Sequence, residues 1–112
     1  MKLKGDNLGE FEELVLIATA TLTDDAYSVS IMDYIIKETR RNVNISAVHE
    51  VLKRLERKGF LKSKMGGATA ERGGRRKRFF ILTSSGKKTL DEVMKLKIQL
   101  YKRVPNFSIR LS

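Results

Sequence analysis

Residues 42–66 read NVNISAVHEVLKRLERKGFLKSKMG and hold the pattern that decides the fold. Apolar residues recur there at intervals of three and four, the spacing of one helix face: Val48, Val51, Leu52 and Leu55. Asn42 to Ile45 forms a short break before this segment, and Gly59 can end a helix. The pattern predicts a helix that begins at Ser46, stops at Gly59 and buries a single face.

The opposite face of this helix is polar and is not needed by the core. It carries Ser46, Ala47, His49, Glu50, Lys53, Arg54 and Arg57. A helix of this kind fits the major groove of DNA, where side chains can reach base edges. We interpret these seven residues as a DNA-binding face; an ordinary amphipathic helix with a solvated basic face is the alternative.

Two extended segments follow, at 60–65 and 77–83, and a glycine-rich stretch separates them. Glycines between apolar, β-forming runs predict a hairpin with a long loop. The hairpin carries a cluster of cations, Arg72, Arg75, Arg76, Lys77 and Arg78, which could neutralise phosphates or merely keep the loop soluble. The loop lacks the Gly-Lys-Ser/Thr ending of a nucleotide-binding loop, so we interpret its glycines as turn residues.

Two further helices are predicted before this region. The first has apolar residues at helical spacing and acidic residues in its opening turn; its inward set is Phe11, Leu14, Val15, Ala18 and Leu22. Thr23 to Asp25 forms a polar turn. The second runs from about Ser28 to Arg40, with a capping box of Ser30 and Asp33, and with Val29, Met32, Ile35 and Ile36 inward.

A last helix is predicted from a cap at Thr83, Ser84 or Ser85 to about Arg103, with Pro105 stopping it. Its apolar residues form two stripes, more than one chain would bury, so a second copy is the simplest cover. The expected dimer interface consists of Phe11, Leu90, Val93, Met94, Leu96, Lys97, Leu100 and Tyr101.

Charge and composition narrow the class of function. The 112 residues carry a net charge of +10, and the excess lies in residues 37–88, with 16 basic and 4 acidic residues, which indicates a polyanionic partner. The absence of cysteine excludes disulfides, thiolate catalysis and Cys-rich zinc sites. His49, the single histidine, lacks companions for a metal site or a catalytic pair; it is either a base or phosphate contact or a plain surface residue.

The longest apolar run, Leu14 to Leu22, has nine residues, too few to cross a bilayer, and its acidic approach is unlike a signal peptide. We therefore expect a cytoplasmic protein without enzyme activity, cofactor, metal or membrane contact.

Three strings of the chain are also familiar together: LGEFEELVLIATATLTDDAYSVSIMDYI (8–35), NVNISAVHEVLKRLERKGFLKSKMG (42–66) and ERGGRRKRFFILTSSGKKTL (71–90). They resemble the PadR family of bacterial transcriptional regulators. The resemblance implies a homodimer, paired through its last helix, that binds an operator and usually represses. Many relatives release DNA on binding a small, often aromatic, ligand; Phe11, Tyr34, Tyr101 and Phe107 could line such a site or simply pack in the core. His49 stands where relatives commonly carry tyrosine, so that tyrosine's contact is not carried over.

The expected fold class is mainly α (α+β), a winged helix-turn-helix with a two-stranded wing and a C-terminal dimerisation helix. Residues 1–82 form the winged helix, and residues 83–112 form the last helix and tail of the same compact unit. The expected partner is double-stranded DNA with a pseudo-palindromic operator, read by two helices about 34 Å apart. The alternative is a winged helix that binds RNA or another protein without operator specificity.

Overall fold

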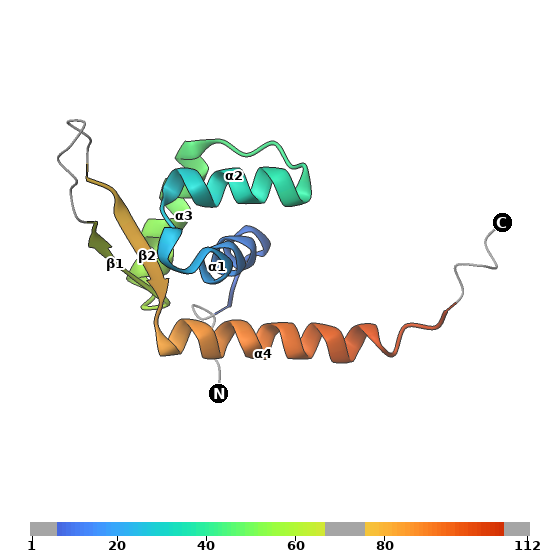
Figure 1. Cartoon of the computed structure of the whole chain (residues 1–112). Helices are drawn as coiled ribbons and strands as arrows, with labels where there is room; N and C mark the ends of the chain where they lie inside the picture. Colours follow the sequence, from blue (N-terminus) through green and yellow to red (C-terminus); the bar gives the residue numbers. More distant parts are fainter. Residues whose placement is uncertain (1–6, 67–75, 107–112) are drawn as a thin grey trace.

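The computed structural model describes residues 7–66 and 76–106. Within these residues, four helices, a short 3₁₀ turn and two strands follow one another (Figure 1). They are α1 (Glu10–Leu22), η2 (Thr23–Asp25), α2 (Ser28–Thr39), α3 (Ile45–Arg57), β1 (Leu61–Met65), β2 (Arg78–Leu82) and α4 (Ser84–Tyr101). The predicted fold class, mainly α with a two-stranded hairpin, is confirmed.

β1 and β2 form an antiparallel pair whose register runs from Leu61 opposite Leu82 to Met65 opposite Arg78. Leu61 and Phe80 are buried under the pair, so alternate side chains face the helices. The backbone N–H of Phe80 donates to the carbonyl of Ala26 at 2.9 Å, which fixes β2 to the turn before α2. Two of the predicted wing cations, Arg72 and Arg75, lie outside the described residues.

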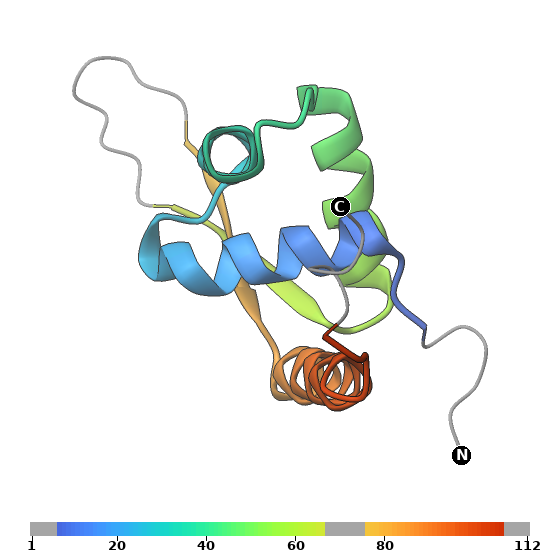
Figure 2. The same ribbon diagram turned by 90° about the vertical axis from the view of Figure 1, so that its right-hand side faces the viewer.

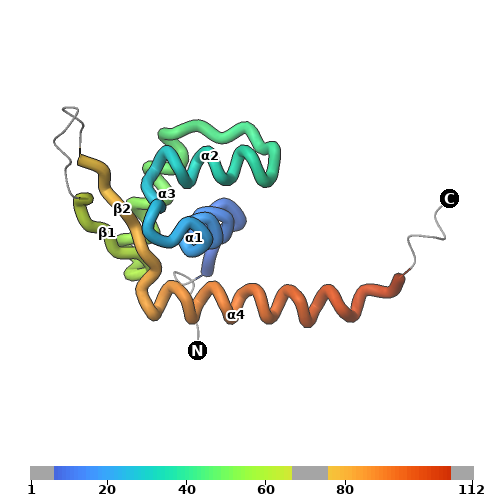
Figure 3. The backbone as a smooth tube through the Cα atoms, viewed as in Figure 1, coloured from blue at the N-terminus to red at the C-terminus, as the bar shows by residue number. Residues whose placement is uncertain are grey.

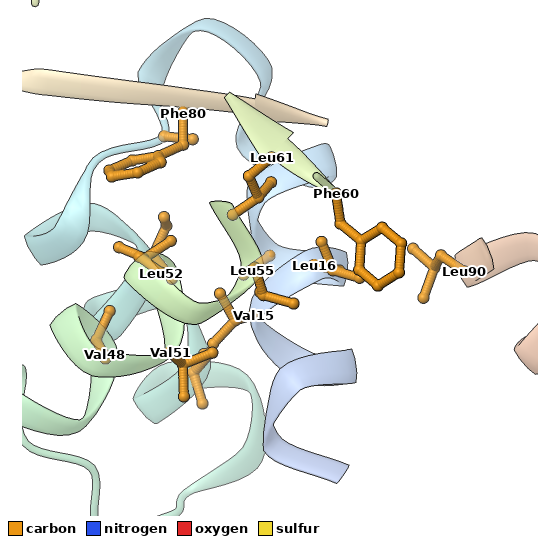
Figure 4. Close-up of a cluster of buried hydrophobic side chains, with 14 residues drawn as sticks. Val15, Leu16, Val48, Val51, Leu52, Leu55, Phe60, Leu61, Phe80 and Leu90 are labelled. Carbon is orange, nitrogen blue, oxygen red and sulfur yellow. The ribbon is translucent and has the colours of Figure 1, made fainter. Parts of the chain in front are cut away.

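The core joins α1, α2, α3 and the hairpin. The predicted inward face of α3 is confirmed, because Val48, Val51, Leu52 and Leu55 are all buried. In Figure 4 the Phe60 side chain points toward Leu90, a buried residue of α4, and Met94 of α4 also packs against the core.

The inward face of α2 was partly mispredicted. Ile31 and Ile35 are buried, whereas Val29 and Ile36 are 44% and 37% exposed. The stripe that α2 buries against α1 and α3 is therefore narrow and rotated by part of a turn from the predicted one. In α1 the fully buried residues include Leu16, which the sequence pattern did not select.

The helix caps refine the predicted boundaries. A capping box of Ser30 with Asp33 was wrong: Ser30 Oγ accepts from the N–H of Tyr27 at 3.0 Å, so Ser30 lies inside the first turn of a helix capped at Tyr27. α3 begins one residue earlier than predicted, at Ile45, because Asn44 Oδ1 accepts from the N–H of Ala47 at 2.9 Å. Thr83, one of the three residues predicted as the possible cap, caps α4 by accepting from the N–H of Gly86 at 3.0 Å.

α4 lies on the opposite side of α1 from α2, and it continues well past the rest of the domain (Figures 1, 2 and 3). Its base is anchored at Gly86, where a Cβ would collide with the carbonyl oxygen of Phe60. Gly86, Thr89 and Leu90 are buried, but from Leu96 onward every described side chain of α4 is exposed. In the described part of the chain, no helix combines the length and apolarity that crossing a membrane requires.

Candidate nucleic-acid interface

The outward face of α3 and the start of β2 border a common hollow of about 730 Å³, whose third side is the N-terminus of α2. Five residues predicted to bind DNA line it: His49, Lys53, Arg76, Lys77 and Arg78. The structure thus brings the helix and three of the five predicted hairpin cations to one surface. Below, this hollow is called the helix–wing groove.

A second depression, of about 550 Å³, lies on the outward side of α3 itself. It is lined by Ser46, Ala47, His49, Glu50 and Lys53. His49 and Lys53 border both hollows, so the two form one continuous surface. Arg57 is exposed one turn beyond Lys53, which extends the same face toward the end of α3.

Arg54 differs from the other predicted residues on α3. Its side chain is half-exposed and lies on the flank of α3 that faces α1, where its guanidinium is 3.4 Å from the buried carboxylate of Glu12. Arg54 therefore stabilises the packing of α3 against α1, whatever else its exposed portion contacts.

Tyr27 holds the loop end of the strand pair beside α2, and sequence reasoning missed it. Its ring packs edge-on against Phe79, with centroids 5.6 Å apart, and the ammonium of Lys77 lies 4.1 Å from the ring centroid. These contacts place Lys77 at the rim of the helix–wing groove. No sequence signal distinguished Tyr27, because the residue lies at a helix boundary outside any periodic pattern.

A short hydrogen-bond chain connects the hairpin to α3. Ser63 Oγ donates to Glu56 Oε2 at 2.7 Å and accepts from Arg78 Nη1 at 3.0 Å. Ser63 thereby fixes β1 against α3 and orients the guanidinium of Arg78. Glu56 and Ser63 were not predicted, since neither residue type is distinctive in a polar stretch.

The electrostatics of the groove favour an anion. Lys53, Arg76, Lys77 and Arg78 outnumber the one lining carboxylate, that of Glu56. Ser28 and Val29, in the first turn of α2, also line it, and a helix N-terminus presents backbone N–H groups with the positive end of the helix dipole. Within residues 7–66 and 76–106, no group of three His, Cys, Asp or Glu side chains could hold a metal ion.

No family model matches the chain, and no curated protein matches its sequence. Solved structures do match. A PadR-like transcription factor from Bacteroides fragilis superposes with a TM-score of 0.69 at 22% identity, covering 82% of this chain and 84% of that one. A PadR family transcription regulator from Clostridium difficile gives 0.63 at 25% identity, covering 89% and 98%. The chain shares the winged-helix fold of these PadR-like structures.

The resemblance found in the sequence is thus confirmed in the fold. The Bacillus subtilis PadR, whose structure is in complex with operator DNA, superposes on this PadR-like chain with a TM-score of 0.64 at 20% identity. The match covers 79% of this chain but only 48% of the Bacillus subtilis chain.

Proposed function

We propose that this PadR-like chain is a DNA-binding transcriptional regulator. The observation that carries the proposal is the helix–wing groove, in which Lys53 of α3 faces Arg76, Lys77 and Arg78 of the hairpin. α3 would enter the major groove of a duplex, and the hairpin would contact the flanking backbone. The Bacillus subtilis relative bound to operator DNA supports this interpretation.

The two sides of the groove have different tasks in this proposal. The exposed positions on the first turns of α3, Ser46, His49, Glu50 and Lys53, contact bases and nearby phosphates. Ala47, Arg54 and Arg57 flank them. The wing cations, including Arg72 and Arg75, neutralise phosphates and so provide salt-dependent affinity. The N-terminus of α2 adds backbone N–H groups for one phosphate.

The regulator acts as a homodimer in this proposal, paired through α4. Leu96 and Tyr101 are 56% and 76% exposed, and Ile98, Leu100 and Val104 are exposed beside them. Such a projecting apolar helix is costly to leave in water, and an identical helix covers it best because a two-fold interface is self-complementary. Phe11, Leu90, Val93 and Met94, partly or fully buried already, would border this contact.

A dimer that occupies two successive major grooves excludes other proteins from that duplex, so the proposed outcome is repression at a pseudo-palindromic operator. A small aromatic effector would act at the α1 end. Phe11 lines a hollow of about 200 Å³ there together with Arg41, and the guanidinium carbon of Arg41 lies 5.8 Å from the ring centroid. Tyr34 and Tyr101 do not line that hollow, and Phe107 lies outside the described residues.

Selection from random duplexes followed by binding titration tests the function. We expect enrichment of a two-fold site, and we expect Lys53→Ala to weaken binding to it by about 1–3 kcal/mol without unfolding the chain. Lys95→Ala is the matched control, because Lys95 is an exposed lysine on α4 that does not line the groove. Equal affinity for random duplex and for RNA would contradict the proposal and favour a non-specific nucleic-acid module.

A further inference from the structure

Lys97 joins α4 to α1 through a single ion pair. Its ammonium nitrogen lies 2.6 Å from Oε1 of Glu13. Lys97 is half-exposed, whereas the Glu13 side chain is only 10% exposed. Although sequence reasoning placed Lys97 in the dimer interface, its ammonium contacts its own chain.

The burial of Glu13 makes this pair more than a surface contact. An ion pair between two half-exposed side chains contributes little to stability. A buried carboxylate that loses its cation, by contrast, is an uncompensated charge. Glu13 lies among the apolar residues of α1, next to the fully buried Val15 and Leu16. α4 is therefore held with Lys97 over Glu13, because separating them removes the cation that pairs with a largely buried carboxylate.

The ion pair lies far enough along α4 to influence the direction of the helix. The buried residues of α4 end at Leu90, and Lys97 follows seven residues later, about 10 Å along the helix axis. Beyond Lys97, no described side chain of α4 has a hydrogen bond or ion pair with the rest of the domain. Lys97 is therefore the last described residue of α4 whose side chain makes a polar contact with the rest of the domain.

The same turn of α1 is also tied to α3. Glu12, the neighbour of Glu13, accepts from Lys58 Nζ at 3.1 Å and pairs with Arg54 at the last turn of α3. Two adjacent buried carboxylates therefore hold the end of α3 on one side and α4 on the other. A rotation of α4 about its N-terminal end would therefore change the angle between α4 and α3.

We propose that the Glu13–Lys97 pair is a positioning device that sets the spacing and orientation of the two α3 helices in the dimer. This rests on the proposed function, since it requires pairing through α4. Because a two-fold axis relates the paired protomers, any change in the angle of α4 occurs in both of them. The relative orientation of the two α3 helices then changes by twice that angle. Lys97 therefore determines operator spacing without touching DNA.

The distance between the two protomers tests this directly, without DNA. The chain has no cysteine, so a single Glu38→Cys substitution on the exposed side of α2 allows one spin label per protomer. Pulsed electron paramagnetic resonance should give a narrow distance distribution for the labelled parent. Lys97→Met should broaden or shift the distribution, whereas Lys97→Arg, which keeps the charge, should restore it. Lys95→Met, a neighbouring exposed lysine, is the matched control.

A second readout uses the selected two-fold site with one base pair inserted or removed between its halves. The parent should bind the altered spacings about a hundredfold more weakly, because both halves cannot be engaged at once. Lys97→Met should lose this discrimination while its affinity for a single half-site stays unchanged.

The possible failures are distinguishable. An unchanged narrow distribution and an unchanged spacing preference in Lys97→Met would overturn this inference and leave the proposed dimeric regulator intact. The absence of any distance between labels would overturn the dimer itself, and this inference with it.

Discussion

Glu12 shows how one residue determines the placement of α3. Its carboxylate accepts from the N–H of Gly9 at 2.8 Å and from Lys58 Nζ at 3.1 Å, and it lies 3.4 Å from Arg54 Nη1. Burial raises the pKa of Glu12, but the hydrogen bond from Gly9 and the ammonium of Lys58 outweigh it, so the net pKa is lowered. The charged form is therefore part of the folded state.

We expect Glu12→Gln to lower the free energy of unfolding by about 1–3 kcal/mol at neutral pH, since charge-assisted hydrogen bonds are lost. A lowered folded-state pKa means that this contribution is present above the ordinary pKa of 4.5 and fades as the pH falls through the folded value. Urea unfolding of parent and variant at pH 7 and at pH 3 measures it. A stability difference that does not shrink in acid would contradict the ionic role of Glu12.

Ion pairs between residues far apart in the chain could not be predicted from the sequence. Glu12 and Lys58 are 46 positions apart, and Glu13 and Lys97 are 84 apart. One sequence offers many carboxylate and ammonium pairs at such separations, and only packing selects among them. For the same reason Arg54 was predicted solely as a DNA contact, although its flank of α3 faces α1.

At the scale of elements, prediction succeeded where a single periodicity met a clear boundary. α3 combines a strict apolar face with Gly59, which adopts a φ of +83° just beyond the helix, and its predicted core residues are correct. α2 has apolar residues on most of its circumference, so periodicity alone could not choose Ile31 over Val29. The helix–wing groove could not be predicted from one element, because α3, the hairpin and the N-terminus of α2 form it together. Nothing in the sequence indicated that Tyr27 and Ser28 would form its third side.

The hairpin should contribute measurably to salt dependence if its cations contact phosphates. Replacing Arg76 and Lys77 with Gln is expected to reduce the slope of log affinity against log salt by about 1.8, because each phosphate contact contributes about 0.9. Titration against the selected duplex at several salt concentrations measures this slope. Lys88→Gln with Lys95→Gln changes net charge equally on α4 and should leave the slope unchanged. Equal slopes for the two double variants would exclude the hairpin from the interface.

At the scale of the whole molecule, the two faces of the domain are separated by the core. α2 lies on one side of α1, and α4 lies on the other (Figure 2). The helix–wing groove is lined by residues of α3, β2 and the N-terminus of α2, and by no residue of α4. The proposed pairing through α4 would therefore leave both grooves of the dimer open. The distance between those grooves would then depend on how α4 is attached to the rest of the domain. This attachment cannot be predicted from the residue pattern of any one helix.

The exposed end of α4 should control assembly separately from folding. We expect Leu96→Asp with Leu100→Asp to convert a dimer of the 12.8 kDa chain into a monomer in analytical ultracentrifugation. Both side chains are at least half-exposed in the single chain, so its stability should change little. Gln99→Asp, on the polar side of the same turn, is the control and should leave the dimer intact.

The consequence for binding follows from avidity. A monomer engages one half-site at a time, so affinity for the two-fold duplex should fall by about a hundredfold, while affinity for an isolated half-site stays the same. A loss of half-site affinity would mean that the substitutions disturb the winged helix itself. An unchanged sedimentation coefficient would mean that α4 does not pair the protomers, and the two α3 helices would then have no fixed spacing with which to recognise a palindrome.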